Sequence, residues 1–296
     1  MHPVTGNSPP QPRRREFRYR DDVVISYEVD GSGPTPVVFL HGFAAALTTW
    51  DDIRSFFPPD RYRLYFLDLK GFGYSSKPHD GAYRPTDQAT VIAAFLSDQG
   101  LSKTILVGHS LGGGIALLTL LDAQAGGKGD LIAGLVLIDC AAYPQRLPPV
   151  LSLLRVPILG WTILHLLPVP FMVKFTLTKL CHDRKTVTPE RIARYIDSFD
   201  RRGIAHVLIE SARHLVPEDY ARIIPAYRDI AVPVLIIWGM HDPIINLQEG
   251  IRLHHAVPAS RLVVIDACGH IPQEESPVKT YTAVADFLEA IDSTAA

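Results

Sequence analysis

The sequence predicts an α/β fold, with a mostly parallel central sheet covered by helices on both faces. Two observations indicate this fold class. Short runs that are apolar throughout are typical of strands buried on both faces of a parallel sheet, and here they alternate with stretches of helix length. Such alternation is the pattern of strand–helix–strand crossover units. The alternation stops between about residues 141 and 216. This stretch contains prolines, short apolar runs and basic segments, and we predict that it is a helical insertion.

Two β-rich runs open the folded part of the chain, at residues 15–20 and 23–31. The second run alternates in the way a hairpin strand does. The apolar runs that follow are predicted as buried strands. They cover residues 36–42, 61–71, 104–110, 131–140, 233–239 and 261–269.

Helices are predicted between these strands. They cover residues 47–57, 86–99, 111–125, 247–255 and 276 or 277 to about 291. Gly126 and Gly127 are expected to end the third of them. Within the insertion the clearest helix start is Thr188-Pro189-Glu190, with threonine as the N-cap, proline at the first helical position and an acid in the first turn.

Composition and charge are those of an ordinary globular protein. The 296 residues are 47% hydrophobic and 20% charged, and 29 Lys and Arg against 31 Asp and Glu give a net charge of −2. This balance gives no global basic field for a nucleic-acid partner. The three scattered cysteines, Cys140, Cys181 and Cys268, form neither a disulfide framework nor a metal-binding pair. We therefore expect no metal site.

The N-terminus and one internal segment bear on location. Residues 1–20 carry arginines after prolines without the apolar core of a secretory signal, so a flexible tail and a cytoplasmic location are expected.

Residues 156–173 contain no Asp, Glu, Lys or Arg, and the length of this segment is close to the ~20 residues of a membrane span. Pro157 and Pro168 would break a continuous helix, so we expect a buried cover and no spanning segment. A weak contact with a membrane interface stays open.

The motif that carries chemistry is Gly-x-Ser-x-Gly at residues 108–112, directly after a predicted strand and before a predicted helix. A serine at this sharp turn is held in a strained backbone conformation with its hydroxyl above the sheet edge. The helix N-terminus behind it favours negative charge. Ser110 is therefore a candidate nucleophile, and the alternative is a buried serine that caps a helix.

A serine nucleophile needs a histidine base and a carboxylate that orients the base. His270 follows the last predicted strand, and Asp242 follows the strand before it, both at the edge where open α/β folds bind ligands. The order Ser110, Asp242, His270 is that of one hydrolase fold. Asp139 also ends a strand and remains the alternative acid.

Five motifs in this order resemble those of the α/β-hydrolase superfamily. They lie at residues 41–43, 68–75, 108–113, 238–243 and 269–277. The resemblance covers about residues 22–140 and 216–292. It implies an α/β-hydrolase fold, with core segments at residues 21–140 and 216–296 and a helical lid at residues 141–215, after the sixth strand. It also implies no cofactor, and an oxyanion hole formed by the backbone N–H groups of Phe43 and Leu111.

The same resemblance narrows the chemistry. Haloalkane dehalogenases and epoxide hydrolases of this superfamily use Asp at the elbow, so Ser110 argues against both. We expect a serine esterase that hydrolyses small to medium apolar esters through an acyl-enzyme. The alternative is a hydrolase of a C–C bond in a ketone or dienoate, of the meta-cleavage-product type, although such enzymes often carry a glycine- and serine-rich loop at residues 43–46. A non-enzymatic binding protein is a third interpretation.

The insertion is rich in arginine and in large apolar side chains. The arginines form the solvated face of lid helices, or one of them pairs with a substrate carboxylate. They are Arg191, Arg194, Arg201, Arg202 and Arg213. The apolar part would line a pocket and favour an acyl or alkyl group. A homodimer is left open.

Overall fold

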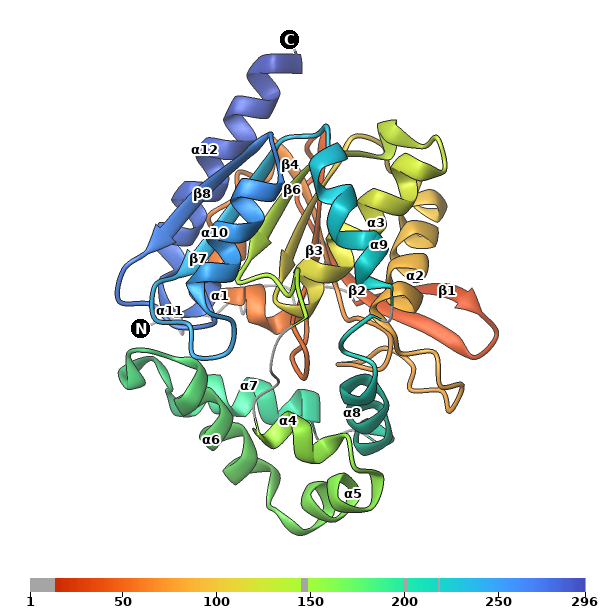
Figure 1. The fold of residues 1–296 in the computed structure, drawn as a ribbon, viewed down its shortest axis with the longest axis vertical. Coiled ribbons are helices and arrows are strands. Elements are labelled where there is room, and N and C mark those ends of the chain that lie inside the picture. The colour runs from red at the N-terminus through yellow and green to blue at the C-terminus, as the bar shows by residue number, and fades with distance from the viewer. Residues whose placement is uncertain (1–13, 145–148, 200–201, 218, 296) are drawn as a thin grey trace, which may run out of the picture.

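The computed structural model describes residues 14–144, 149–199, 202–217 and 219–295 (Figure 1). Its core is an eight-stranded sheet in the order β1-β2-β4-β3-β5-β6-β7-β8. β1 with β2 and β2 with β4 pair antiparallel, and all later pairs are parallel. The strands are β1 (Arg15–Arg20), β2 (Val23–Asp30), β3 (Thr35–Leu40), β4 (Tyr62–Leu67), β5 (Thr104–His109), β6 (Ile132–Ile138), β7 (Val234–Gly239) and β8 (Ser260–Ile265).

All the predicted strands are present, and the mostly parallel sheet is confirmed. The predicted tail extends too far, because residues 15–20 form β1 and pair with β2. Phe17 fixes this edge strand by packing edge-on against Phe95, with ring centroids 5.6 Å apart. Residues 1–13 of the predicted tail lie outside the described residues.

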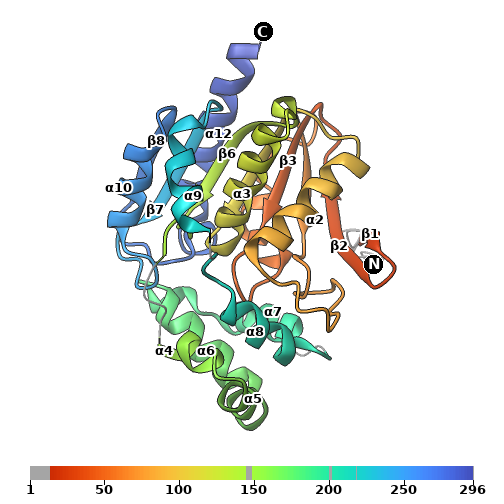
Figure 2. The same ribbon diagram turned by 45° about the vertical axis from the view of Figure 1, so that its right-hand side comes forward.

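Helices cover both faces of the sheet (Figures 1 and 2). Alternate residues of each strand point to opposite faces, so Val38 and Leu40 of β3 enter one hydrophobic cluster, while Val37 and Phe39 enter the other. Because each face of the strand packs against an apolar cluster, consecutive residues in the middle of a central strand are apolar, and this explains the continuous apolar runs in the sequence. The first packs under α2 (Pro85–Asp98), α3 (Leu111–Ala125), α9 (Tyr220–Ala226) and α10 (Leu247–Ala256), and the second under α1 (Asp51–Arg54) and α12 (Pro277–Ala295).

The insertion follows β6, the sixth strand, as predicted, and forms a separate helical layer (Figure 1). Its helices are α4 (Pro149–Leu154), α5 (Pro157–Leu166), α6 (Val169–Leu180), α7 (Pro189–Phe199) and α8 (Ile204–Arg213). The predicted cap of α7 is confirmed, because the N–H of Arg191 donates to Thr188 Oγ1 at 3.3 Å. Short elements complete the chain: η1 (Leu47–Trp50), η2 (Gly129–Leu131), η3 (Arg184–Thr186), η4 (Tyr227–Asp229) and α11 (Pro272–Glu275).

Within the described ranges, no single helix is long and apolar enough to cross a bilayer. Ile158–Leu166 of α5 and Val169–Leu180 of α6 reach that length and composition only together, and they are bent by 105° at the break between them.

Candidate active site

Ser110 lies at the sharp turn between β5 and α3. Its φ of 51° and ψ of −115° lie outside the usual regions for a residue with a Cβ, in agreement with the predicted strain. The N–H of Ser110 donates to the carbonyl of Ile138 at 2.9 Å, and its own carbonyl accepts from the N–H of Ala141 at 3.0 Å. A Cβ at Gly112 would lie 2.2 Å from the Leu40 carbonyl oxygen. Glycine there lets α3 approach β3 closely enough to form the turn.

The fold brings Ser110, His270 and Asp242 together from three different loops. His270 Nε2 lies 3.0 Å from Ser110 Oγ, and His270 Nδ1 lies 2.7 Å from Asp242 Oδ2. The N–H groups of Ile244 and Ile245 donate to Asp242 Oδ1 at 2.7 and 3.0 Å. A carboxylate at Nδ1 favours the tautomer that carries its proton there, which leaves Nε2 free to accept the serine proton.

The two candidate acids differ in charge state. Burial acts to raise the pKa of Asp242, but the adjacent His270 and the N–H groups of Ile245 and Ile244 outweigh it and lower the pKa below its ordinary value. Asp139 is fully buried at the end of β6, and its Oδ1 accepts from the N–H of Gly239 at 3.0 Å. Burial, and then the neighbouring Asp242 carboxylate, raise the pKa of Asp139 well above its usual range. Asp242 is therefore the ionised acid that contacts the His270 ring.

The backbone around His270 is held from three directions. Its N–H donates to the carbonyl of Leu180 at the end of α6, at 2.9 Å, and its carbonyl lies 2.6 Å from His109 Nε2. The N–H of Gly269 donates to Glu275 Oε2 at 2.9 Å. Burial, and then His270, lower the pKa of His109 to about 3, so the neutral His109 ring donates from Nε2. The insertion thus takes a direct part in positioning His270.

Both predicted oxyanion donors adjoin the serine. Leu111 is the first residue of α3, so its N–H has no acceptor within the helix. Phe43 follows Gly42, which packs so closely on the elbow that a Cβ there would lie 3.3 Å from Ser110 Cβ. The two N–H groups belong to two different segments that both adjoin Ser110.

His41 fixes the loop that carries Phe43. Its Nδ1 lies 2.7 Å from the Gly42 carbonyl oxygen, and its Nε2 accepts from the N–H of Leu69 at 3.0 Å. Complete burial lowers the pKa of His41 to about 4. The neutral ring therefore links this loop to the one after β4.

An apolar cavity lies beside the elbow, with an empty volume of about 310 Å³. This volume includes open solvent at the mouth of the cavity, so the enclosed part is much smaller. The lining comes from α2, α3, α9 and neighbouring loops, and the lining residues that the structure describes are all uncharged. The lining residues are Pro85, Leu111, Gly114, Leu118, Ala141, Leu215, Pro217, Tyr220, Ile223 and Tyr227.

One cluster at the site could in principle hold a metal ion. Ligand atoms of His109, Asp139 and His270 lie within 4.8 Å of one another. Both nitrogens of His270 contact Ser110 and Asp242, and His109 Nε2 contacts the His270 carbonyl. A metal would have to break these contacts, so the donor set fits the hydrogen-bonded arrangement better.

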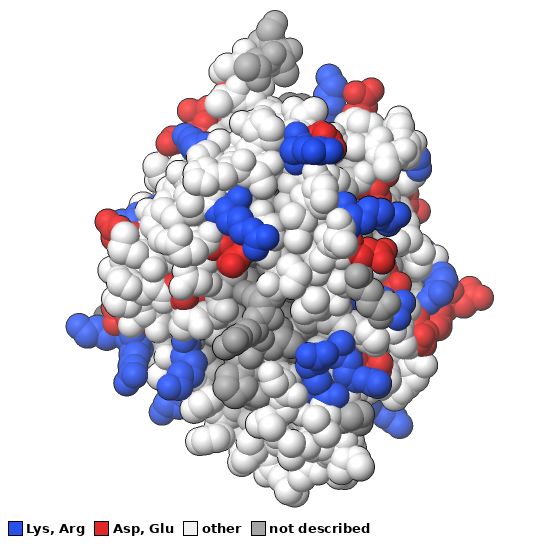
Figure 3. All heavy atoms as spheres, in the orientation of Figure 1, with Lys and Arg blue, Asp and Glu red and all other residues white. Residues whose placement is uncertain are grey.

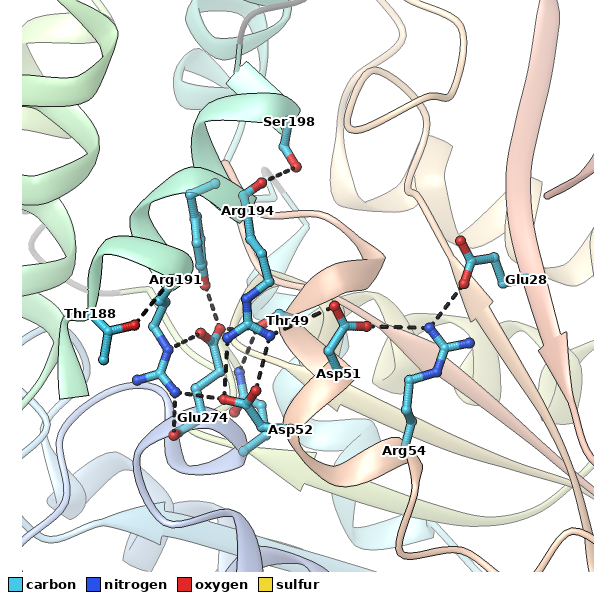
Figure 4. A network of polar contacts seen from close by, with 12 residues as sticks. Glu28, Thr49, Asp51, Asp52, Arg54, Thr188, Arg191, Arg194, Ser198 and Glu274 are labelled. Carbon is cyan, nitrogen blue, oxygen red and sulfur yellow. Dashed lines mark hydrogen bonds and ion pairs between the residues drawn. The ribbon is translucent and has the colours of Figure 1, made fainter. Parts of the chain in front are cut away.

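Two arginines of α7 have contacts that the sequence did not predict (Figure 4). Arg191 Nη2 lies 2.6 Å from Asp52 Oδ2, and Arg191 Nε lies 3.1 Å from Glu274 Oε2. Arg194 Nη1 lies 2.9 Å from Asp52 Oδ1. Buried Glu274 also accepts hydrogen bonds from Thr49 and Tyr195. This network joins α7 to α1 and α11.

The other arginines fit the solvated face better than a substrate contact. Arg213 is exposed and pairs with Glu210 at 3.1 Å, and Arg202 is exposed. Arg201 lies outside the described residues. The solvated-face interpretation is therefore wrong for buried Arg191, which pairs with the core.

Comparisons with known proteins agree with this architecture. A sequence profile described as the alpha/beta hydrolase family matches residues 37–284. The uncharacterized hydrolase YugF of Bacillus subtilis is 28% identical over 275 residues, which are 91% of this chain and 96% of that protein. The 2-hydroxy-6-oxo-2,4-heptadienoate hydrolase of Pseudomonas putida is 28% identical over 271 residues, 88% of this chain and 91% of that protein. A thermophilic esterase from Thermogutta terrifontis aligns at 25% identity with a TM-score of 0.77, over 94% of this chain and 99% of that one.

Proposed function

Because the chain belongs to the alpha/beta hydrolase family, we propose that it is a serine hydrolase that cleaves carboxylic esters of small to medium apolar substrates. The observation that carries the proposal is the continuous contact from Ser110 Oγ to His270 (3.0 Å) and from His270 to Asp242 (2.7 Å). This is the geometry in which a histidine can take the serine proton while a carboxylate stabilises the resulting imidazolium.

The reaction proceeds in two halves. Ser110 Oγ attacks the ester carbonyl carbon while His270 Nε2 takes the hydroxyl proton, and the N–H groups of Phe43 and Leu111 hold the oxyanion. His270 then returns the proton to the leaving alcohol, which departs and leaves an acyl-enzyme. Water then attacks the acyl-enzyme with His270 as the base. This step releases the carboxylic acid and regenerates the Ser110 hydroxyl. An oxyanion donor typically contributes about a hundred- to a thousandfold to turnover.

The cavity supports an apolar substrate. It includes Leu111, the residue after the nucleophile, and its described lining residues are uncharged, so an alkyl or acyl group placed there would remain beside the attacked carbonyl. The insertion would act as the lid of this site, because Leu180 at the end of α6 holds the backbone of His270.

Hydrolysis of a C–C bond next to a ketone is the second candidate. It is favoured by the similarity to the Pseudomonas putida dienoate hydrolase. A dienoate carries a carboxylate, for which a cation near the site would be expected. Among the described arginines of the insertion, Arg191, Arg194 and Arg213 already contact carboxylates of the protein itself, and the engagement of these three supports the neutral ester.

Hydrolysis of p-nitrophenyl esters from acetate to palmitate, with 2-hydroxy-6-oxo-2,4-heptadienoate as the competing substrate, tests the proposal. We expect ester turnover that peaks at one chain length and is lost in Ser110→Ala. Turnover of the dienoate alone would establish the second candidate. Failure of an organophosphonate to label Ser110 in the folded protein, with neither substrate cleaved, would favour a binding protein.

A further inference from the structure

Exposed apolar side chains are concentrated on one part of the insertion. Of the fourteen large apolar side chains that are exposed in the described part of the chain, nine lie between residues 153 and 175. Ile158 is 83% exposed, Leu166 75% and Trp161 56%. Scattered apolar side chains are normal on protein surfaces, whereas a contiguous patch marks an interaction site.

The exposed apolar side chains of α6 lie on a different side of the helix from those that pack against α7. Val173 and Leu177 are buried in a small cluster with Ile192 of α7. Phe171 and Phe175, one turn apart, are exposed, and their rings lie nearly parallel with centroids 6.3 Å apart. We call the exposed side chains Ile158, Trp161, Leu166, Phe171 and Phe175 the outer face of α5 and α6. α6 is therefore apolar on two sides, and only the inner side is used within the chain.

The charged side chains of the segment that carries the outer face have one sign. Residues 141–182 contain no Asp or Glu. Arg155, Lys174 and Lys179 are exposed there, and Lys179 Nζ lies 5.8 Å from the centre of the Phe175 ring. Figure 3 shows the lower end of the molecule as mostly uncharged, with blue side chains along its lower left edge. Within this segment the apolar side chains are therefore flanked by cations alone, which matches an interface of acyl chains beneath anionic headgroups.

The geometry of α5 and α6 fits helices that lie on a membrane surface better than helices that cross the bilayer. They meet at 105°, with Pro168 and Pro170 beside the bend. The inner face of α6 is packed on α7, so α6 cannot enter the acyl region as a whole without breaking that cluster.

We propose that the outer face of α5 and α6 docks the protein on an anionic phospholipid surface. The proposal goes beyond the ester chemistry and does not depend on it, because docking needs no turnover. The docked face would adjoin the candidate active site, since α6 ends at Leu180, whose carbonyl accepts from the N–H of His270 at 2.9 Å.

Vesicle flotation of the full chain carrying Ser110→Ala tests this directly, with phosphatidylcholine vesicles that contain or lack phosphatidylglycerol. We expect flotation with the anionic vesicles, weaker flotation with the neutral ones, and a loss of binding as salt is raised. Tryptophan fluorescence gives an independent signal, because Trp50 and Trp238 are fully buried and Trp161 is exposed. Anionic vesicles should shift the Trp161 emission to shorter wavelength, and Trp161→Phe should abolish the shift.

Two double variants separate the apolar and the ionic contributions. Phe171→Ser with Phe175→Ser, and Lys174→Glu with Lys179→Glu, should each lower vesicle partitioning by at least about tenfold. Val278→Ser with Lys279→Glu, at exposed positions of α12, is the matched control and should bind as the parent does. Circular dichroism checks that each variant is folded.

Three results would overturn the proposal. The first is an absence of flotation with anionic vesicles at low salt. The second is binding that the two double variants leave unchanged. The third is sedimentation of the parent as a dimer that the phenylalanine variant dissociates, without vesicle binding, because a second copy would then be the occupant of the outer face.

Discussion

The buried carboxyl groups of Asp139 and Asp242 are close enough to influence each other electrostatically, and Asp242 is the one that contacts the His270 ring, at 2.7 Å. Two buried carboxyl groups this close cannot both be ionised without a large electrostatic cost. The proton resides on Asp139, whose pKa is raised by burial and by Asp242. Asp139 thus serves as a neutral support beside Asp242, and its Oδ1 accepts from the N–H of Gly239.

Asparagine should replace Asp139 with little loss. Asn presents the same acceptor and donor as a protonated acid and tolerates the positive φ of 42° at this position. We expect Asp139→Asn to retain kcat within about threefold, and Asp139→Ala, which leaves the Gly239 N–H unpaired, to lose about tenfold. Steady-state kinetics on the best p-nitrophenyl ester measures both. An equal loss in the two variants would mean that Asp139 acts through a negative charge.

The candidate triad makes a graded prediction. Ser110→Ala should lower kcat by roughly a millionfold, and Asp242→Asn by about ten thousandfold because the His270 tautomer is no longer held. Thermal melting should show that both variants remain folded. Near-normal turnover in Asp242→Asn together with loss in Asp139→Asn would exchange the roles of the two acids.

The contact between α7 and the core should be stabilising because its charges are buried. Arg191→Met leaves Glu274 and Asp52 without this partner, and we expect the free energy of unfolding to fall by about 3 kcal/mol. Arg184→Met, at an exposed position of η3, is the control and should change it by less than about 0.5 kcal/mol. Urea unfolding measures both. An Arg191→Met variant as stable as the control would show that the network in Figure 4 contributes little.

The buried ring of His41 should make the fold sensitive to acid. Its pKa of about 4 in the folded state lies below the ~6.5 of an unfolded histidine, so its contribution to stability is complete above pH 6.5 and is lost as pH falls. Between pH 7.5 and 5.0 the loss is about 2 kcal/mol. The pH dependence of the unfolding free energy should be smaller by this amount in His41→Asn. Parallel pH profiles for parent and variant would contradict the assignment.

The sheet and the elbow could be predicted because their signals are local. β3 packs against apolar clusters on both faces, so its sequence is apolar throughout, and the residues around Ser110 form a contiguous motif. Residues 15–20 were predicted both as a β-rich run and as part of the tail, because β1 is an edge strand in which Phe17 alone is buried.

The role of Arg191 could not be predicted because its partners are distant in sequence. Asp52 is 139 residues away and Glu274 is 83 residues away, and nothing in α7 itself distinguishes a buried arginine from a solvated one. The contact between Leu180 and His270 was missed for a related reason, since backbone groups carry no sequence signal.

The insertion leaves the sheet after β6 and returns to β7, and these two strands are direct neighbours in the sheet. Its two ends are therefore anchored at adjacent points, and a longer, shorter or differently folded segment could connect them without shifting the register of any strand. Ser110, Asp242 and His270 all belong to the part of the chain outside it. Such a layout would let the covering segment vary, apart from the Leu180 contact to His270, while the candidate triad keeps its place on an unchanged scaffold.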